Sequence, residues 1–335
     1  MSDNDLGVRH RALNSLQLLY EPNAEKFWEK VEERIVVEQD GVCIQKIAHS
    51  LNSEYIITND LSKVCSNCNV LIHKLANDDD IPRDTWSDLV AITLRISLRH
   101  DRELAFNIIN NGISIKQFSH NLIYTTRSVL NEYNGKKLYV EELNKGAILF
   151  DILQLQLTFR FGEILRKGIQ SPDVRDDFEI IDLVIQNLYF AYDYDNGNKK
   201  ATKDLTLPEK KAFYEKIKPL LDYTANKSLG IEQGFMVAHT GYYFMQLLNK
   251  LLPLEPDYIL KLSNIIVVCA AKNNFTFDRI TLREIVTLTE GIIADHRIIL
   301  KEKQNFLYLI EILDQFTTSG FEEAIELTWR LKEAF

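Results

Sequence analysis

The chain has 335 residues and a formal net charge of −9, and its 13 glycines and 7 prolines are sparse for a protein rich in turns and hairpins. Apolar residues make up 46% of the chain and charged residues 26%, the balance of a globular protein rather than a disordered one. Nonspecific nucleic-acid affinity comes mainly from Lys and Arg that neutralise phosphates. The acidic total therefore argues against a general phosphate-binding surface and leaves room only for a local basic strip.

The sequence predicts a cytoplasmic protein. Its first five residues lack the basic-then-apolar order of a signal peptide. Even the apolar run at residues 265–271 is far shorter than the roughly 20 residues that span a bilayer, so no membrane segment is expected. Four cysteines in a chain of this size do not make a dense disulfide framework, and we expect their thiols to be reduced.

The first predicted helix covers residues 3–16. Acidic and amide residues at positions 3–5 offer capping oxygens at its start. Apolar residues then recur at helical spacing, at Val8, Ala12, Leu16 and Leu19. Such a helix cannot bury its apolar face alone and implies a stack of further helices. The pattern is typical of the first helix of a HEAT-type repeat rather than of a natural protein beginning.

Three antiparallel helix pairs are predicted in residues 1–112. The break at Asp40 and Gly41 separates the second helix from the third, and a fourth helix is predicted to begin near residues 58–60. Two pairs in about 80 residues match the roughly 40-residue period of HEAT-like repeats. Gly112 closes the third pair, as glycine commonly does at a helix C-terminus. We therefore interpret residues 1–112 as HEAT-like helical repeats.

Beyond residue 112 the predicted pattern loses regularity. Residues 113–192 are predicted to continue the stack with longer helices, and residues 193–207 to form a mobile polar loop because they are rich in turn-forming residues. Residues 208–335 are predicted to form a C-terminal helical domain. No strand-like alternation is long enough to predict a sheet. The predicted fold is all-α, with HEAT-like antiparallel helix pairs stacked as an α-solenoid that is less regular in its C-terminal half.

Cys65 and Cys68 form a CxxC pair with His73 five residues further on. Zinc needs about four converging ligands, and CxxC pairs often supply two of them. Both cysteines, however, fall on an apolar helical stripe that runs from Leu61 to Leu75, where cysteine acts as a small hydrophobic residue. We expect them to be buried on one helix without a metal. A metal-dependent enzyme centred on Cys65 and Cys68, or a redox pair, is the alternative.

Arg95, Arg99 and Arg102 form a basic stripe at helical spacing. Ordinary pairing with surface Asp and Glu is the interpretation we favour, although the stripe could also contact an acidic partner or a phosphate chain. A nucleic-acid-binding groove would need these arginines on one surface with the lysines of residues 199–203. The chain contains no phosphate-binding loop, nucleophile elbow or HExxH helix, so we expect no catalytic residues and no cofactor.

Residues 234–335 carry a more specific pattern. It lies in residues 235–238, 243–249, 256–257, 275–278, 294–297, 313–316, 320–324 and 329–331. This pattern resembles the extreme C-terminal HEAT-like region of large bacterial ATP-binding proteins of the STAND or AAA type. The chain has Tyr243 where that family tends to place His, and Phe321 where it tends to place Trp. The nucleotide-binding domain of the family is absent here, so no ATPase residue is carried over.

Together these patterns predict a non-enzymatic module for protein interaction, scaffolding or sensing, because stacked helix pairs present extended concave surfaces. The resemblance implies the C-terminal part of a bacterial NTPase system, by analogy one for defence against phage, whose partner is a protein or the missing N-terminal NTPase portion. Nucleic-acid binding through a local basic groove is the alternative from another class.

Overall fold

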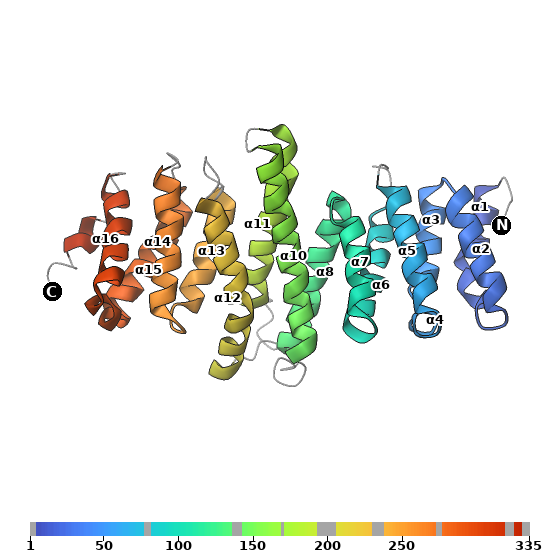
Figure 1. Ribbon diagram of the computed structural model, residues 1–335, viewed down its shortest axis with the longest axis horizontal. Helices are drawn as coiled ribbons and strands as arrows, with labels where there is room; N and C mark the ends of the chain where they lie inside the picture. The colour runs from blue at the N-terminus through green and yellow to red at the C-terminus, as the bar shows by residue number, and fades with distance from the viewer. Residues whose placement is uncertain are drawn as a thin grey trace. The chain divides into compact units, whose positions relative to one another are not determined.

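The computed structural model describes residues 5–76, 82–135, 143–168, 171–192, 206–229, 238–272, 277–318 and 325–329. Within these ranges all regular secondary structure is helical, so the predicted all-α class is confirmed (Figure 1). The chain divides into two compact units, Met1–Ser128 and Val129–Phe335, called unit 1 and unit 2. None of the helices in the described ranges is both long and apolar enough to cross a bilayer.

Unit 1 is built from two rows of helices. Its elements are α1 (Leu6–Asn14), η1 (Leu16–Leu19), α2 (Ala24–Val37), α3 (Gly41–Leu51), α4 (Glu54–Asn59), α5 (Leu61–Leu75), α6 (Arg83–Arg99), α7 (Arg102–Gly112) and the first part of α8 (Lys116–Gly135). In one row α1 packs against α3 and α3 against α6, and in the other α2 packs against α5 and α5 against α7. Contacts between α2 and α3 and between α6 and α7 join the two rows.

Side chains just before the helices fix where they begin. The Asp5 carboxylate accepts a hydrogen bond from the backbone N–H of Gly7 at 2.7 Å, and Asp40 accepts one from Cys43 at 2.9 Å. Each satisfies a donor that the first turn of a helix leaves unpaired. The capping expected at the first helix is therefore confirmed at Asp5.

The apolar stripe of the first helix differs from the predicted one. Val8 was expected on the buried face, yet it is 47% exposed, and Leu13 and Leu16 are the buried residues. The α-helix ends at Asn14, and the chain continues as the 3-10 helix η1. A 3-10 helix has three residues per turn, so the single α-helical stripe that the sequence suggested does not persist across this boundary.

A short helix that the sequence pattern did not predict lies between the third and fourth predicted helices. This helix, α4, contains only six residues, and α5 follows after the single residue Asp60. Periodicity cannot show a helix of this length, because six residues hold fewer than two turns of the apolar repeat.

Unit 2 also has two rows of helices, on average longer than those of unit 1. Its elements are the remainder of α8, α10 (Leu143–Lys167), η2 (Pro172–Val174), α11 (Arg175–Tyr192), α12 (Leu207–Leu229), α13 (Ala238–Leu251), α14 (Pro256–Lys272), α15 (Arg279–Asp295), η3 (Arg297–Lys301) and α16 (Lys303–Thr318). α10, α12, α14 and α16 pack in succession, as do α11, α13 and α15. Of the predicted loop 193–207, only residues 206 and 207 lie within the described ranges, and Leu207 already begins α12.

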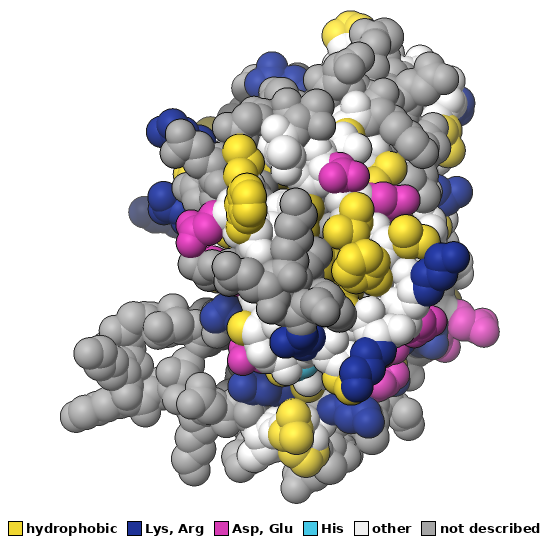
Figure 2. All heavy atoms as spheres, turned by 90° about the vertical axis from the view of Figure 1, so that its left-hand side faces the viewer, with side chains coloured by type: hydrophobic (Ala, Val, Ile, Leu, Met, Phe, Trp, Pro, Cys, Tyr) yellow, Lys and Arg dark blue, Asp and Glu magenta, His cyan; other side chains and the backbone are white. Residues whose placement is uncertain are grey.

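Large apolar side chains are exposed at the C-terminal end of unit 2. They are Ile280, Ile298, Leu307, Ile325 and Trp329. Figure 2 views this end and shows hydrophobic side chains among lysine, arginine and acidic side chains. The final helix was predicted to bury Ile325, but in the described segment Leu327 is the buried residue.

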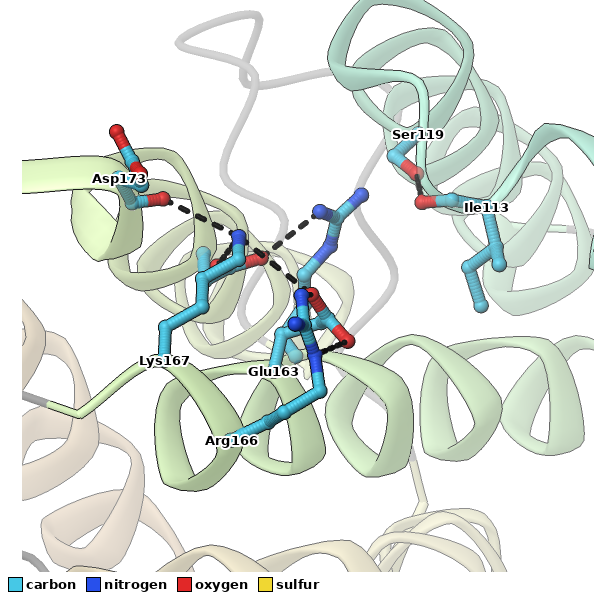
Figure 3. A network of polar contacts seen from close by, with 8 residues as sticks. Ile113, Ser119, Glu163, Arg166, Lys167 and Asp173 are labelled. Carbon is cyan, nitrogen blue, oxygen red and sulfur yellow. Dashed lines mark hydrogen bonds and ion pairs between the residues drawn. The ribbon is translucent and has the colours of Figure 1, made fainter. Parts of the chain in front are cut away.

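A buried ion pair fastens α10 to α11. The Arg160 guanidinium donates to Asp177 at 2.9 Å, and both side chains are almost fully buried. Lys167 Nζ contacts the other Asp177 oxygen at 2.9 Å, and this hydrogen bond raises the pKa of Lys167. Figure 3 shows Lys167 reaching toward Asp173, while Arg166 lies against Glu163. The carboxylate of Asp177 in α11 thus pairs with two cations of α10, Arg160 and Lys167.

We expect Asp177→Ala to lower the free energy of unfolding by about 3 to 5 kcal/mol, because it removes the carboxylate that pairs with the buried guanidinium of Arg160. The control is Glu163→Ala, which removes the more exposed pair with Arg166 and should cost at most about 1 kcal/mol. Urea unfolding followed by circular dichroism measures both, and equal effects of the two substitutions would contradict the interpretation.

Residue 112, the last of α7, is glycine because of close packing rather than backbone conformation. A Cβ atom placed there would lie 2.6 Å from Cδ1 of Phe118, whose ring is fully buried and packs edge-on to Trp86. The next helix therefore passes too close to allow a side chain. Gly162, inside α10, would have no neighbouring atom within 4 Å of an added Cβ and carries no such constraint.

The two glycines give a matched test. We expect Gly112→Ala to destabilise the protein by about 1 to 3 kcal/mol, because Phe118 must shift in a packed core. Gly162→Ala makes the same chemical change in an open helical position and should stabilise by up to about 1 kcal/mol. Thermal or urea unfolding of both variants decides the matter, and a stabilising Gly112→Ala would refute the close-packing explanation.

Candidate functional site

Unit 1 contains an open pocket of about 490 Å³ between η1 and α4. It is lined by Gln17, Leu18, Tyr20, Glu21, Ser53, Tyr55 and Ile56. Leu18 is 76% exposed and Tyr55 59%, although both have large apolar surfaces. The pocket's volume is within the range of small-molecule and side-chain binding sites.

Two short elements bring these residues together. η1 places Leu18 on the surface while Leu16 points into the core. α4 begins directly after Ser53, so Tyr55 stands in its first turn and Ile56 is buried beneath. The sequence pattern did not predict this site, since it did not reveal α4 and no local pattern links Tyr20 to Tyr55. The cluster of aromatic residues at positions 20–28 was the one available signal.

The aromatic wall of the pocket is held in a fixed geometry. The Tyr20 ring meets the Tyr55 ring edge-on, with centroids 5.7 Å apart and an interplanar angle of 88°. It meets Phe27 in the same way at 5.3 Å. Edge-to-face packing is a favourable aromatic arrangement, and Tyr20 itself is only 6% exposed. The buried ring of Tyr20 therefore supports the exposed ring of Tyr55.

The Asp60 carboxylate fixes the aromatic residues behind the pocket through hydrogen bonds. Its Oδ2 accepts hydrogen bonds from the Tyr20 hydroxyl at 2.8 Å and from Trp28 Nε1 at 2.7 Å. Asp60 directly precedes α5 but makes no side-chain capping bond, so its carboxylate serves the aromatic cluster instead. The hydrogen bond from Trp28, supported by that from Tyr20, lowers the pKa of Asp60. Burial and the Asp60 contact raise the pKa of Tyr20 to about 12.

Cys65 and Cys68 are both buried on α5, so the burial predicted from the apolar stripe is confirmed. Burial raises the pKa of the Cys65 thiol to about 11 and also raises that of Cys68. A raised pKa disfavours the thiolate that metal binding and redox exchange require. His73 on the same helix is exposed, and no group of three or more His, Cys, Asp or Glu side chains in the described ranges is placed to hold a metal ion.

The arginine stripe contacts an acidic side chain and an aromatic ring. Arg95 Nε and Arg99 Nη1 each lie 3.4 Å from Oε2 of Glu54 in α4. Arg102 instead stacks its guanidinium over the Phe106 ring at 5.1 Å. The shared contact with Glu54 offsets part of the positive charge that a phosphate-binding strip would need. The lysines of residues 199–203 lie outside the described residues.

Comparison of the chain with protein-family models, with curated proteins and with solved structures found no match. The resemblance to STAND or AAA-type proteins therefore stays a hypothesis. Of the residues that carry it, 235–237, 275–276, 320–324 and 330–331 lie outside the described ranges. Phe244 and Met245 are buried in α13, in keeping with a packing pattern.

Asp60→Asn tests the anchoring carboxylate. At neutral pH we expect the variant to be less stable by about 1 to 2 kcal/mol, because charge-assisted hydrogen bonds become neutral ones. The pKa of Asp60 is lowered in the folded state, so its contribution is present above the ordinary value of 3.8 and is lost as the pH falls through the lowered one. Urea unfolding across pH should show the two proteins converging in acid. A pH-independent difference would contradict this.

Proposed function

We propose that this chain is an α-solenoid of HEAT-like helix pairs that binds a protein partner as a scaffold or sensor module and does not act as an enzyme. Support for the repeat comes from polar contacts between successive helices of a row. Side-chain bonds of this kind join Asn52 to Asp88, Asn111 to Asn69, Asn249 to Glu284 and Asn264 to Glu311, at separations of 36, 42, 35 and 47 residues. These separations bracket the roughly 40-residue period of HEAT repeats.

The observation that carries the binding role is the pocket with Leu18 and Tyr55 at its mouth. Tyrosine is enriched among the residues that dominate binding energy at protein interfaces, since it offers a large contact area and loses little conformational freedom. Here the Tyr55 ring is already positioned by Tyr20, which Asp60 holds in turn. A partner would therefore meet a preorganised surface.

The resemblance of residues 234–335 supports a partner of a particular kind. By that analogy the chain works in the cytoplasm beside an ATP-binding domain of a bacterial STAND or AAA-type system. The chain would serve as a sensor or assembly surface, and the ATP-binding domain would bind and hydrolyse the nucleotide. This step is an analogy between packing patterns. The pocket itself is independent of it, because the pocket lies in unit 1 and the resemblance in unit 2.

Affinity capture with cross-linking mass spectrometry tests the proposal. We expect the purified chain to retain a specific protein after nuclease treatment, and Leu18→Asp or Tyr55→Asp to weaken capture by about tenfold or more, as for interface hot spots. Leu165→Asp is the matched control, since Leu165 is a similarly exposed apolar side chain in unit 2.

Two results would count against this proposal. If nuclease removes the captured material and Arg95→Glu with Arg99→Glu abolishes tight nucleic-acid binding at physiological salt, the chain is a nucleic-acid-binding module. If all three aspartate variants capture the partner equally, the pocket is not the binding surface. Unchanged thermal unfolding of each variant shows that lost capture is not lost folding.

A further inference from the structure

Unit 2 contains a lysine held between two tyrosines and a glutamate. The ammonium group of Lys218 lies 4.2 Å from the ring centroid of Tyr258 and 5.6 Å from that of Tyr214. It also contacts Oε2 of Glu255 at 2.6 Å. The two tyrosine rings stand edge to face, 6.2 Å apart at 71°. Cation–π attraction and the carboxylate thus act on one ammonium group.

The pocket of unit 1 has the same three groups around an open space. Tyr20 and Tyr55 stand edge to face at 5.7 Å and 88°, and Glu21 lines the same pocket. In the described part of the chain no lysine or arginine forms an ion pair with Glu21. Lys63, which interacts with Asp60, lies over the Trp28 ring. The arrangement that Lys218 fills in unit 2 is therefore open to an outside cation in unit 1.

We propose that this pocket binds the side chain of a lysine from the partner protein, an inference that rests on the proposed function. The ammonium group would meet the carboxylate of Glu21 and the exposed ring of Tyr55, which Tyr20 supports. The aliphatic stem would lie along the exposed side chain of Leu18, above the buried Ile56, since lysine buries its methylene groups on apolar surfaces while its charge stays near water. A carboxylate at the rim makes the site complementary to a cation and repels acidic residues.

The probe is N-acetyl-lysine methylamide, titrated into the full chain carrying ¹³C-labelled leucine and isoleucine methyl groups. We expect saturable shifts of the Leu18 and Ile56 methyl signals, with a dissociation constant on the order of 10 mM for so small a ligand. The Nε-acetylated form of the same compound has a neutral amide in place of the ammonium and should give no saturable shift.

Variants assign the effect to the three groups. Glu21→Gln should weaken binding about threefold to fivefold, as expected for an exposed charge, and Tyr55→Leu by a similar factor through loss of the ring face. Glu32→Gln removes the same charge from α2 without touching the pocket and should leave the affinity unchanged.

Equal binding of the Nε-acetylated probe, or the absence of saturable methyl shifts, would overturn the lysine assignment. Tighter binding of N-acetyl-arginine methylamide would replace lysine by arginine as the ligand. The outcome can be separated from that of the proposed function. If partner capture depends on Leu18 and Tyr55 while the lysine probe does not bind, the interaction role stands and this inference fails. If the probe binds but substitutions at Leu18 and Tyr55 leave partner capture unchanged, the pocket binds an ammonium group and its role in capturing the partner fails.

Discussion

An amphipathic helix is stable in water only when other helices pack against its apolar stripe. In this chain many of those packing partners are not the next helix in the sequence but the one after it. In unit 2, α13 packs between α11 and α15, and α14 between α12 and α16. The same constraint gives unit 1 its two rows. Polar side chains such as Asn249 and Asn264 then find their partners on the next helix of the row, which explains why their hydrogen bonds join residues far apart in the sequence.

Asp60 links this packing to the surface pocket. Its carboxylate holds Tyr20 and Trp28, which belong to the core, and Tyr20 in turn supports Tyr55. A charged hydrogen-bond acceptor is strong enough to fix two ring donors in place. A substitution of Asp60, at the start of α5, is therefore expected to alter the positions of Tyr20 and Tyr55, although Asp60 does not line the pocket.

The two tyrosine and glutamate clusters place the same kinds of groups in two settings, one with a cation of the chain and one at an open pocket. Around Lys218 the cation belongs to the chain, and the cluster ties α12 to the beginning of α14. In unit 1, Tyr20, Tyr55 and Glu21 line an open pocket. Aromatic faces and a carboxylate attract ammonium groups in either setting. In unit 2 the ammonium group of Lys218 already occupies the cluster, whereas the cluster of unit 1 lines a pocket open to solvent.

The sequence by itself determined the features that depend on neighbours within a few turns. Helix class, the cap at Asp5 and the burial of Cys65 and Cys68 follow from periodicity and local hydrogen bonding. The tertiary structure decided which stripe of the first helix is buried and why residue 112 is glycine, since the latter depends on the approach of Phe118.

The pocket also belongs to the tertiary structure. Its two walls come from η1 and α4, which are both shorter than the apolar repeat that would reveal a helix. Its two rings, Tyr20 and Tyr55, are 35 positions apart, and the hydrogen bond that holds Tyr20 goes to Asp60, 40 residues away. The pairing of Arg95 and Arg99 with Glu54 is equally remote in sequence. Local patterns record which face of a helix is apolar. They do not record which distant helix covers it, and that choice places the side chains of the site.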